Sequence, residues 1–117
     1  MPQTVLIVDD HAGFRCAARA ILEAEGYAVV AESATGREAL EAVARLRPAL
    51  VLLDIGLPDL DGIEVAGRLT SADRSLAVVL TSSRDASDYW PLLDRSGARG
   101  FIPKAELSGA AVAALTA

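Results

Sequence analysis

The segment Val51-Leu-Leu-Asp-Ile-Gly-Leu-Pro-Asp-Leu-Asp-Gly62 decides how this chain is organised. It opens with an apolar, β-prone run that stops at the carboxylate of Asp54, and a loop containing Pro58 follows. An ionised group at the end of a buried strand is costly unless it is solvated, paired or bound to a metal. In open α/β sheets this edge is also where ligands bind. Asp54 is therefore the first candidate for chemistry, with a turn or helix-capping aspartate as the alternative.

Length and composition describe one acidic domain. The 117 residues suffice for a single domain with its own core, which we expect to span 1–117. The net charge of −5 makes this domain a poor electrostatic match for nucleic acid. Neither a long apolar span nor a signal-like N-terminus is visible, and Cys16 is the only cysteine. We therefore expect no membrane association and a reducing, cytoplasmic location.

Short apolar runs alternate with helical patterns along the whole chain. Strands are expected at 4–8, 27–31, 51–53, 76–80 and 101–103. Helices are expected at 11–25, from a capping box at 35–38 to just before Pro48, at 61–69, at 85–96 and at 106–115. The fourth helix should begin late, near Pro91, or kink. This alternation predicts an α/β fold of five βα units, a doubly wound parallel sheet with helices on both faces.

The pattern also predicts which side chains face the core. In the first helix Ala17 and Leu22 lie at helical spacing, and Cys16 is expected to be a small packing residue. The second helix should turn Leu46 inward, and the last should do the same with Leu107. Because a proline donates no ladder hydrogen bond, the 101–103 strand is expected at a sheet edge.

Polar side chains follow four of the five expected strands at the points where their apolar runs end. These are Asp9, Asp10, Asp54, Thr81, Ser82 and Lys104. Carboxyl ends of parallel strands meet at one edge, so three carboxylates, hydroxyls and an ammonium should converge there. Such hard oxygen donors suit Mg²⁺ or Mn²⁺, and an aspartate can accept a phosphoryl group. His11 is expected to be solvated or paired with an acid.

Four motifs carry a resemblance to a known family. They are V8-D-D-H11, L53-D-I-G-L-P-D-L-D-G62, L80-T-S82 and G97-A-R-G-F-I-P-K104. Together they resemble a response-regulator receiver domain, over essentially the whole chain. The piece A31-E-S-A-T-G-R-E-A39, with D9-D-H11, further resembles receivers of NarL/LuxR-type transcriptional regulators. The resemblance implies a flavodoxin-like, CheY-like sheet of order 2-1-3-4-5.

The resemblance also implies roles for the residues at the sheet edge. Asp54 would accept a phosphoryl group from a sensor histidine kinase. Asp10, Asp54 and the carbonyl of Gly56 would ligate Mg²⁺, with Asp9 acting partly through water. Lys104 would contact the phosphoryl group. Phosphorylation would alter homodimerisation or release an output domain.

Two details of the switch depend on how the family pattern is aligned. The family spacing counted back from Lys104 places the switch hydroxyl at Ser82, whereas the end of the expected strand places it at Thr81, which we favour. Phe101 would be the aromatic that rotates with that hydroxyl, or else an ordinary core residue. The family lysine is commonly followed by a proline in a cis peptide, and Ala105 stands there in this chain.

Three other functions remain open at this stage. An aspartate-nucleophile phosphohydrolase would usually carry two acids in a D-x-D arrangement, whereas Asp9 and Asp10 are adjacent. A flavodoxin-like nucleotide binder would need a phosphate loop after the first strand, where two carboxylates stand. A degenerate receiver would act by protein binding alone. The chain is expected to be either a single-domain regulator or a part of a longer one with a C-terminal helix-turn-helix output domain.

Overall fold

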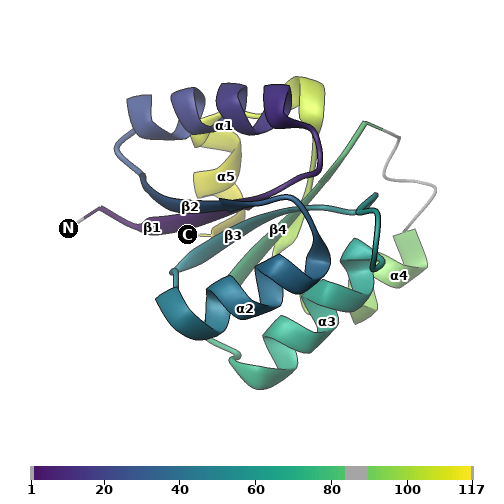
Figure 1. Cartoon of the computed structure of the whole chain (residues 1–117). Helices are drawn as coiled ribbons and strands as arrows, with labels where there is room; N and C mark the ends of the chain where they lie inside the picture. Colours follow the sequence, from purple (N-terminus) through teal and green to yellow (C-terminus); the bar gives the residue numbers. More distant parts are fainter. Residues whose placement is uncertain (1, 84–89, 117) are drawn as a thin grey trace.

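The computed structural model describes residues 2–83 and 90–116 and has one parallel sheet of five strands in the order β2-β1-β3-β4-β5 (Figure 1). The strands are β1 (Thr4–Val8), β2 (Ala28–Ser33), β3 (Leu50–Asp54), β4 (Ala77–Ser82) and β5 (Gly100–Pro103). The helices are α1 (Ala12–Ala24), α2 (Gly36–Leu46), α3 (Gly62–Ala72), α4 (Trp90–Arg95) and α5 (Gly109–Thr116). The predicted doubly wound sheet and its strand order are confirmed.

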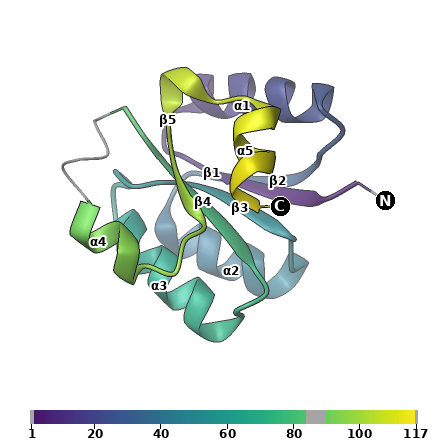
Figure 2. The ribbon, with the colours of Figure 1, turned by 180° about the vertical axis from the view of Figure 1, so that it is seen from behind.

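Helices cover both faces of the sheet, as Figures 1 and 2 show, with α1 and α5 on one side and α2, α3 and α4 on the other. Alternate residues of each strand enter the two cores. In β1, Val5 and Ile7 pack toward α1 and α5, whereas Leu6 and Val8 pack toward α2 and α3. Burial on both faces explains why the central strands β1, β3 and β4 contain continuous apolar runs. Among the described residues, no helix combines the length and apolar composition that crossing a bilayer would require.

Three strands run further than their apolar patterns predicted, and one of them is β3, which includes Asp54. β4 includes Thr81 and Ser82, and β2 continues to Ser33. Thr81 pairs with Asp54 of β3, and Ser82 pairs with Pro103 of β5. The backbone ladder to the neighbouring strands therefore sets where β4 ends, not the loss of apolar character.

The last two helices, α4 and α5, differ in how their starts compare with the sequence predictions. α4 is described from Trp90, just before Pro91; the earlier part of the expected helix, 85–89, lies outside the described residues, so the late start stays a prediction. A proline is tolerated in the first turn of a helix, where no amide partner is needed. The predicted start of α5 is wrong: a 3-10 turn at Lys104–Glu106 comes first, and α5 begins only at Gly109. β5 lies at the sheet edge, as its proline predicted.

Three packing predictions on the helices are wrong. Cys16 and Ala17 are exposed, because the buried face of α1 is set by Ala18 and Leu22 and a helix turns about 100° per residue. Leu46 is 40% exposed, since α2 packs through smaller residues nearer its start. Leu107 is buried as predicted, although it lies before α5 rather than within it.

The predicted capping box of α2 is present in a shifted form. Thr35 Oγ1 accepts a hydrogen bond from the Glu38 amide at 3.1 Å. The Glu38 carboxylate accepts from the amide of Ala34 at 3.0 Å, one residue before the N-cap. Asp59, from the loop after β3, accepts from the amides of Gly36 and Arg37 as well. The free amides at this helix start are thereby paired, and the loop that follows Asp54 is tied to α2.

Candidate functional site

Two carboxylates and the only lysine of the chain meet at the carboxyl edge of the sheet. Asp9 directly follows β1 and is fully buried, and Asp54, the last residue of β3, is 4% exposed. Lys104 directly follows β5. Its Nζ lies 2.6 Å from Asp9 Oδ2 and 3.5 Å from Asp54 Oδ2. The ammonium therefore bridges two buried carboxylates whose negative charges would otherwise repel each other.

The surroundings of Asp54 oppose its negative charge. Burial raises the pKa of its carboxyl most, and the charge of Asp9 raises it further. The amide of Gly56, which donates to Asp54 Oδ1 at 3.2 Å, and the Lys104 ammonium act in the opposite direction without cancelling the effect. For Lys104, burial lowers the pKa, but the pairing with Asp9 and Asp54 outweighs it, so the pKa lies above its usual value. The site thus holds excess negative charge that a further cation would relieve.

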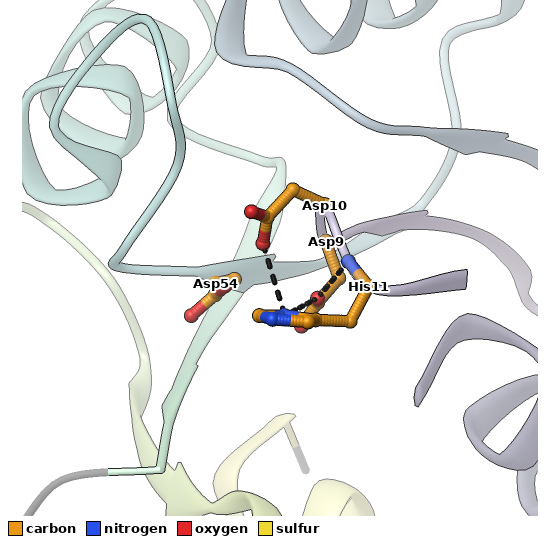
Figure 3. Close-up of side chains that lie close together, drawn as sticks. All are labelled: Asp9, Asp10, His11 and Asp54. Atoms are coloured by element: carbon orange, nitrogen blue, oxygen red, sulfur yellow. Dashed lines mark hydrogen bonds and ion pairs between the residues drawn. The ribbon is translucent and has the colours of Figure 1, made fainter. Parts of the chain in front are cut away.

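Asp10 and His11 extend this edge outward (Figure 3). His11 Nδ1 lies 3.1 Å from Asp10 Oδ1 and 3.3 Å from Asp9 Oδ1, so the predicted acid-paired histidine is confirmed. One ligand atom from each of Asp9, Asp10, His11 and Asp54 lies within 4.8 Å of the others. The three carboxylates, here called the acidic cluster, are the hard oxygen donors that Mg²⁺ and Mn²⁺ prefer. The donor set fits such an ion.

Asp54 faces an open hollow of about 410 Å³, here called the Asp54 hollow. Its lining residues are His11, Asp54, Ile55, Gly56, Leu57, Asp61, Ser82, Ser83 and Lys104. Asp54 is thus buried along its strand yet reachable from outside at its carboxylate.

The structure places the two candidate switch hydroxyls differently. Thr81 is fully buried, and its Oγ1 has no hydrogen-bond partner in the described part of the chain. Ser82 lines the Asp54 hollow, because β4 continues past Leu80 and ends at Ser82. Of the two, Ser82 is therefore the residue that borders the hollow, and it is the position indicated by counting back from Lys104.

The other residues singled out from the sequence lie at or near this edge. Gly56 is exposed beside Asp54, and its amide holds the Asp54 carboxylate. Phe101 is half-buried and packs against the core on the side of α2, α3 and α4. Sequence reasoning missed Phe14, whose ring centroid lies 4.7 Å from Lys104 Nζ in a cation–π contact. Its ring also packs against the core on the side of α1 and α5, and only the fold brings it to the lysine.

Sequence reasoning placed Asp61 and Gly62 at the start of the third helix, as the structure does, but missed that both lie beside Asp54. Asp61 caps α3 by accepting from the amide of Ile63 at 2.8 Å, and it also lines the Asp54 hollow. Gly62 packs directly against the backbone carbonyl of Asp54, where any Cβ would overlap. An aspartate followed by glycine at a helix start was the available signal, but the sequence did not show what the glycine touches.

The order of the strands and the acidic cluster with its lysine define the class of this protein. The family model for the response regulator receiver domain matches residues 5–116, and the chain belongs to that family. It is 41% identical over 106 residues to BvgA of Bordetella pertussis, which is named as a transcription regulator of virulence factors. That match covers 91% of this chain and 51% of BvgA. The chain spans about half the length of curated relatives named as transcriptional regulators.

Solved structures agree with this assignment. The receiver domain of NarL from Mycobacterium tuberculosis is 30% identical with a TM-score of 0.85, and the match covers 97% of this chain and 96% of that one. A CheX–CheY complex with BeF3 and Mg²⁺ from Borrelia burgdorferi has a chain that is 28% identical with a TM-score of 0.87. There the match covers 98% of this chain and 87% of the other. The chain is thus a receiver domain of the two-component type.

Proposed function

We propose that Asp54 is the phosphorylation site of this receiver and takes its phosphoryl group from a sensor histidine kinase. The phosphorus–nitrogen bond of the kinase phosphohistidine breaks, a bond forms from an Asp54 carboxylate oxygen to phosphorus, and the histidine nitrogen takes up a proton. One observation carries this proposal: Asp54 has one oxygen held by the Gly56 amide and the other beside Lys104, at the mouth of an open hollow. In this role the domain is phosphorylated itself and does not act as a phosphohydrolase on other molecules.

The acidic cluster would hold a divalent ion in this role. When bound, Mg²⁺ or Mn²⁺ would offset the charge of the carboxylates and of the incoming phosphoryl oxygens. Asp10, Asp54 and the Gly56 carbonyl would be direct ligands, and Asp9 would act partly through water. Supporting this, the described ligand atoms lie within 4.8 Å of one another, and the solved CheX–CheY complex that contains a similar chain also contains BeF3 and Mg²⁺.

Phosphorylation would switch the domain between two states. Lys104, now paired with Asp9 and Asp54, would exchange that pairing for the phosphoryl oxygens. Ser82 would donate its hydroxyl at the mouth of the hollow, whereas Thr81 and Phe101 would repack behind it. Movement of β4, α4 and β5 would then change homodimerisation or the contacts of a helix-turn-helix output domain. The name of BvgA supports transcription as the output.

The test is the intact mass after incubation with Mg²⁺ and acetyl phosphate. The wild type should gain one phosphoryl group, and Asp54→Asn should gain none. Glu64→Gln is a matched control, since it removes an exposed carboxylate of α3 whose partner is the exposed Arg68, and it should react like the wild type. Ser82→Ala should change the reaction rate more than Thr81→Val. No gain in a folded wild type, or an unchanged gain in Asp54→Asn, would contradict the proposal.

A further inference from the structure

Both backbone groups of Asp9 are tied toward the edge strand β2. The Asp9 amide donates to the carbonyl of Ser33 at 3.0 Å. The Asp9 carbonyl accepts from Nη1 of Arg15 at 2.6 Å. Asp9 is therefore fixed by its main chain, independently of the contacts that its carboxylate makes with His11 and Lys104.

Arg15 is itself held in place by β2. Its Nε lies 3.1 Å from Oε1 of Glu32, and its side chain is only 19% exposed. Two edges of one planar guanidinium thus engage two acceptors, the Glu32 carboxylate and the Asp9 carbonyl. A fork of this kind fixes direction as well as distance, which a flexible ammonium does not.

The carbonyl that Arg15 binds belongs to the peptide that joins Asp9 to Asp10. Because a peptide unit is planar, fixing its oxygen also fixes the direction in which the chain leaves toward Asp10. The Asp10 side chain has one partner in the described ranges, Nδ1 of the 72% exposed His11. The position of the Asp10 carboxylate therefore depends mainly on this peptide.

We propose that Arg15, braced by Glu32, is a positioning residue that fixes the Asp9–Asp10 peptide and so sets the spacing of the carboxylates for the divalent ion. The inference rests on the proposed metal-dependent function. Groups that orient metal ligands without touching the metal commonly change its affinity about 10–100-fold when removed. The edge strand β2 thereby contributes to the metal site although none of its residues is a ligand.

Arg19 offers a matched control on the same helix. Its Nε lies 2.8 Å from the other oxygen of Glu32, and it also bonds Glu23 and the carbonyl of Val29. Among the contacts of the described residues, Arg19 has no hydrogen bond to Asp9. Arg15→Met and Arg19→Met therefore each remove one of the two arginines that pair with Glu32. Only Arg15→Met also removes the hydrogen bond to the Asp9 carbonyl.

The experiment compares Mn²⁺ affinity, measured by electron paramagnetic resonance, in the wild type and these variants. Arg15→Met should weaken Mn²⁺ binding about tenfold, whereas Arg19→Met should keep nearly the wild-type affinity. In the metal-free protein, the Asp9 carbonyl carbon and Asp10 amide signals should shift in NMR spectra of Arg15→Met and not of Arg19→Met. Arg15→Lys, which keeps the charge without the fork, gives a second test and should also bind Mn²⁺ more weakly than Arg19→Met does.

The outcomes separate this inference from the proposed function. Equal Mn²⁺ affinities and unshifted Asp9 and Asp10 signals in the Arg15 variants would overturn the positioning role and leave Asp54 phosphorylation standing. A folded wild type that binds no Mn²⁺ would overturn both.

Discussion

Replacing Lys104 by methionine should strongly destabilise the metal-free protein. The change removes the ammonium that lies 2.6 Å from Asp9 and 3.5 Å from Asp54, two carboxylates that are 0% and 4% exposed. With an effective dielectric constant of about 20, unit charges at these separations attract by roughly 6 and roughly 5 kcal/mol. Most of this gross attraction is offset by the cost of burying the charges.

The net effect is therefore smaller than the Coulomb terms. Removing one partner of a buried ion pair typically costs about 3–5 kcal/mol. Because the Lys104 side chain keeps 16% exposure and methionine can still pack on Phe14, we expect the lower end, about 3 kcal/mol. The isolated carboxylates then become a better cation site, so Mg²⁺ should stabilise the variant more than the wild type.

The assay is urea unfolding with EDTA and again with saturating Mg²⁺. Lys104→Met should lose about 3 kcal/mol of unfolding free energy in EDTA and clearly less in Mg²⁺. Asp9→Asn should reduce the effect of the lysine change in a double-mutant cycle. The control Arg68→Met, which breaks an exposed pair with Glu64, should cost less than about 0.5 kcal/mol. Equal losses with EDTA and with Mg²⁺ would refute the reasoning.

Two further predictions concern the framework around the site. Gly62→Ala should lower the unfolding free energy by about 2 kcal/mol, because the new Cβ would overlap the Asp54 carbonyl. The control Gly67→Ala, in the same helix, places its Cβ in open space and should be neutral or stabilising. Equal urea midpoints for the two variants would contradict this prediction. The pKa of Glu32 is lowered, first by its hydrogen bond from Arg19, so its stabilisation is present above the ordinary glutamate pKa and is lost as the pH falls through the lowered value. As the pH is lowered from neutral, the melting temperature should therefore fall more steeply in the wild type than in Glu32→Gln. An equal fall in both proteins would contradict a stabilising role of the ion pairs between Glu32 and its arginines.

The sequence predicted the fold well because burial on both faces leaves a strong signal. Each strand contains a short apolar run, and each polar residue of interest follows one of these runs. The ends of strands and helices were predicted less well where hydrogen bonds to a neighbouring strand or a helix cap decide them. β4 takes in Thr81 and Ser82 because β3 and β5 pair with them, which no local pattern records. The same displacement makes Ser82, rather than Thr81, the residue that lines the Asp54 hollow.

The sequence by itself determined the chemical inventory of the site: acids after two strands, hydroxyls after a third and the only lysine after a fourth. Their convergence followed from parallel strands, whose carboxyl ends share one edge. Only the tertiary structure decided which atoms meet: Lys104 on Asp9 more closely than on Asp54, Phe14 under the lysine, and Arg15 on the Asp9 carbonyl. These contacts join residues from different elements, so they depend on strand register and helix packing, which local sequence patterns do not encode.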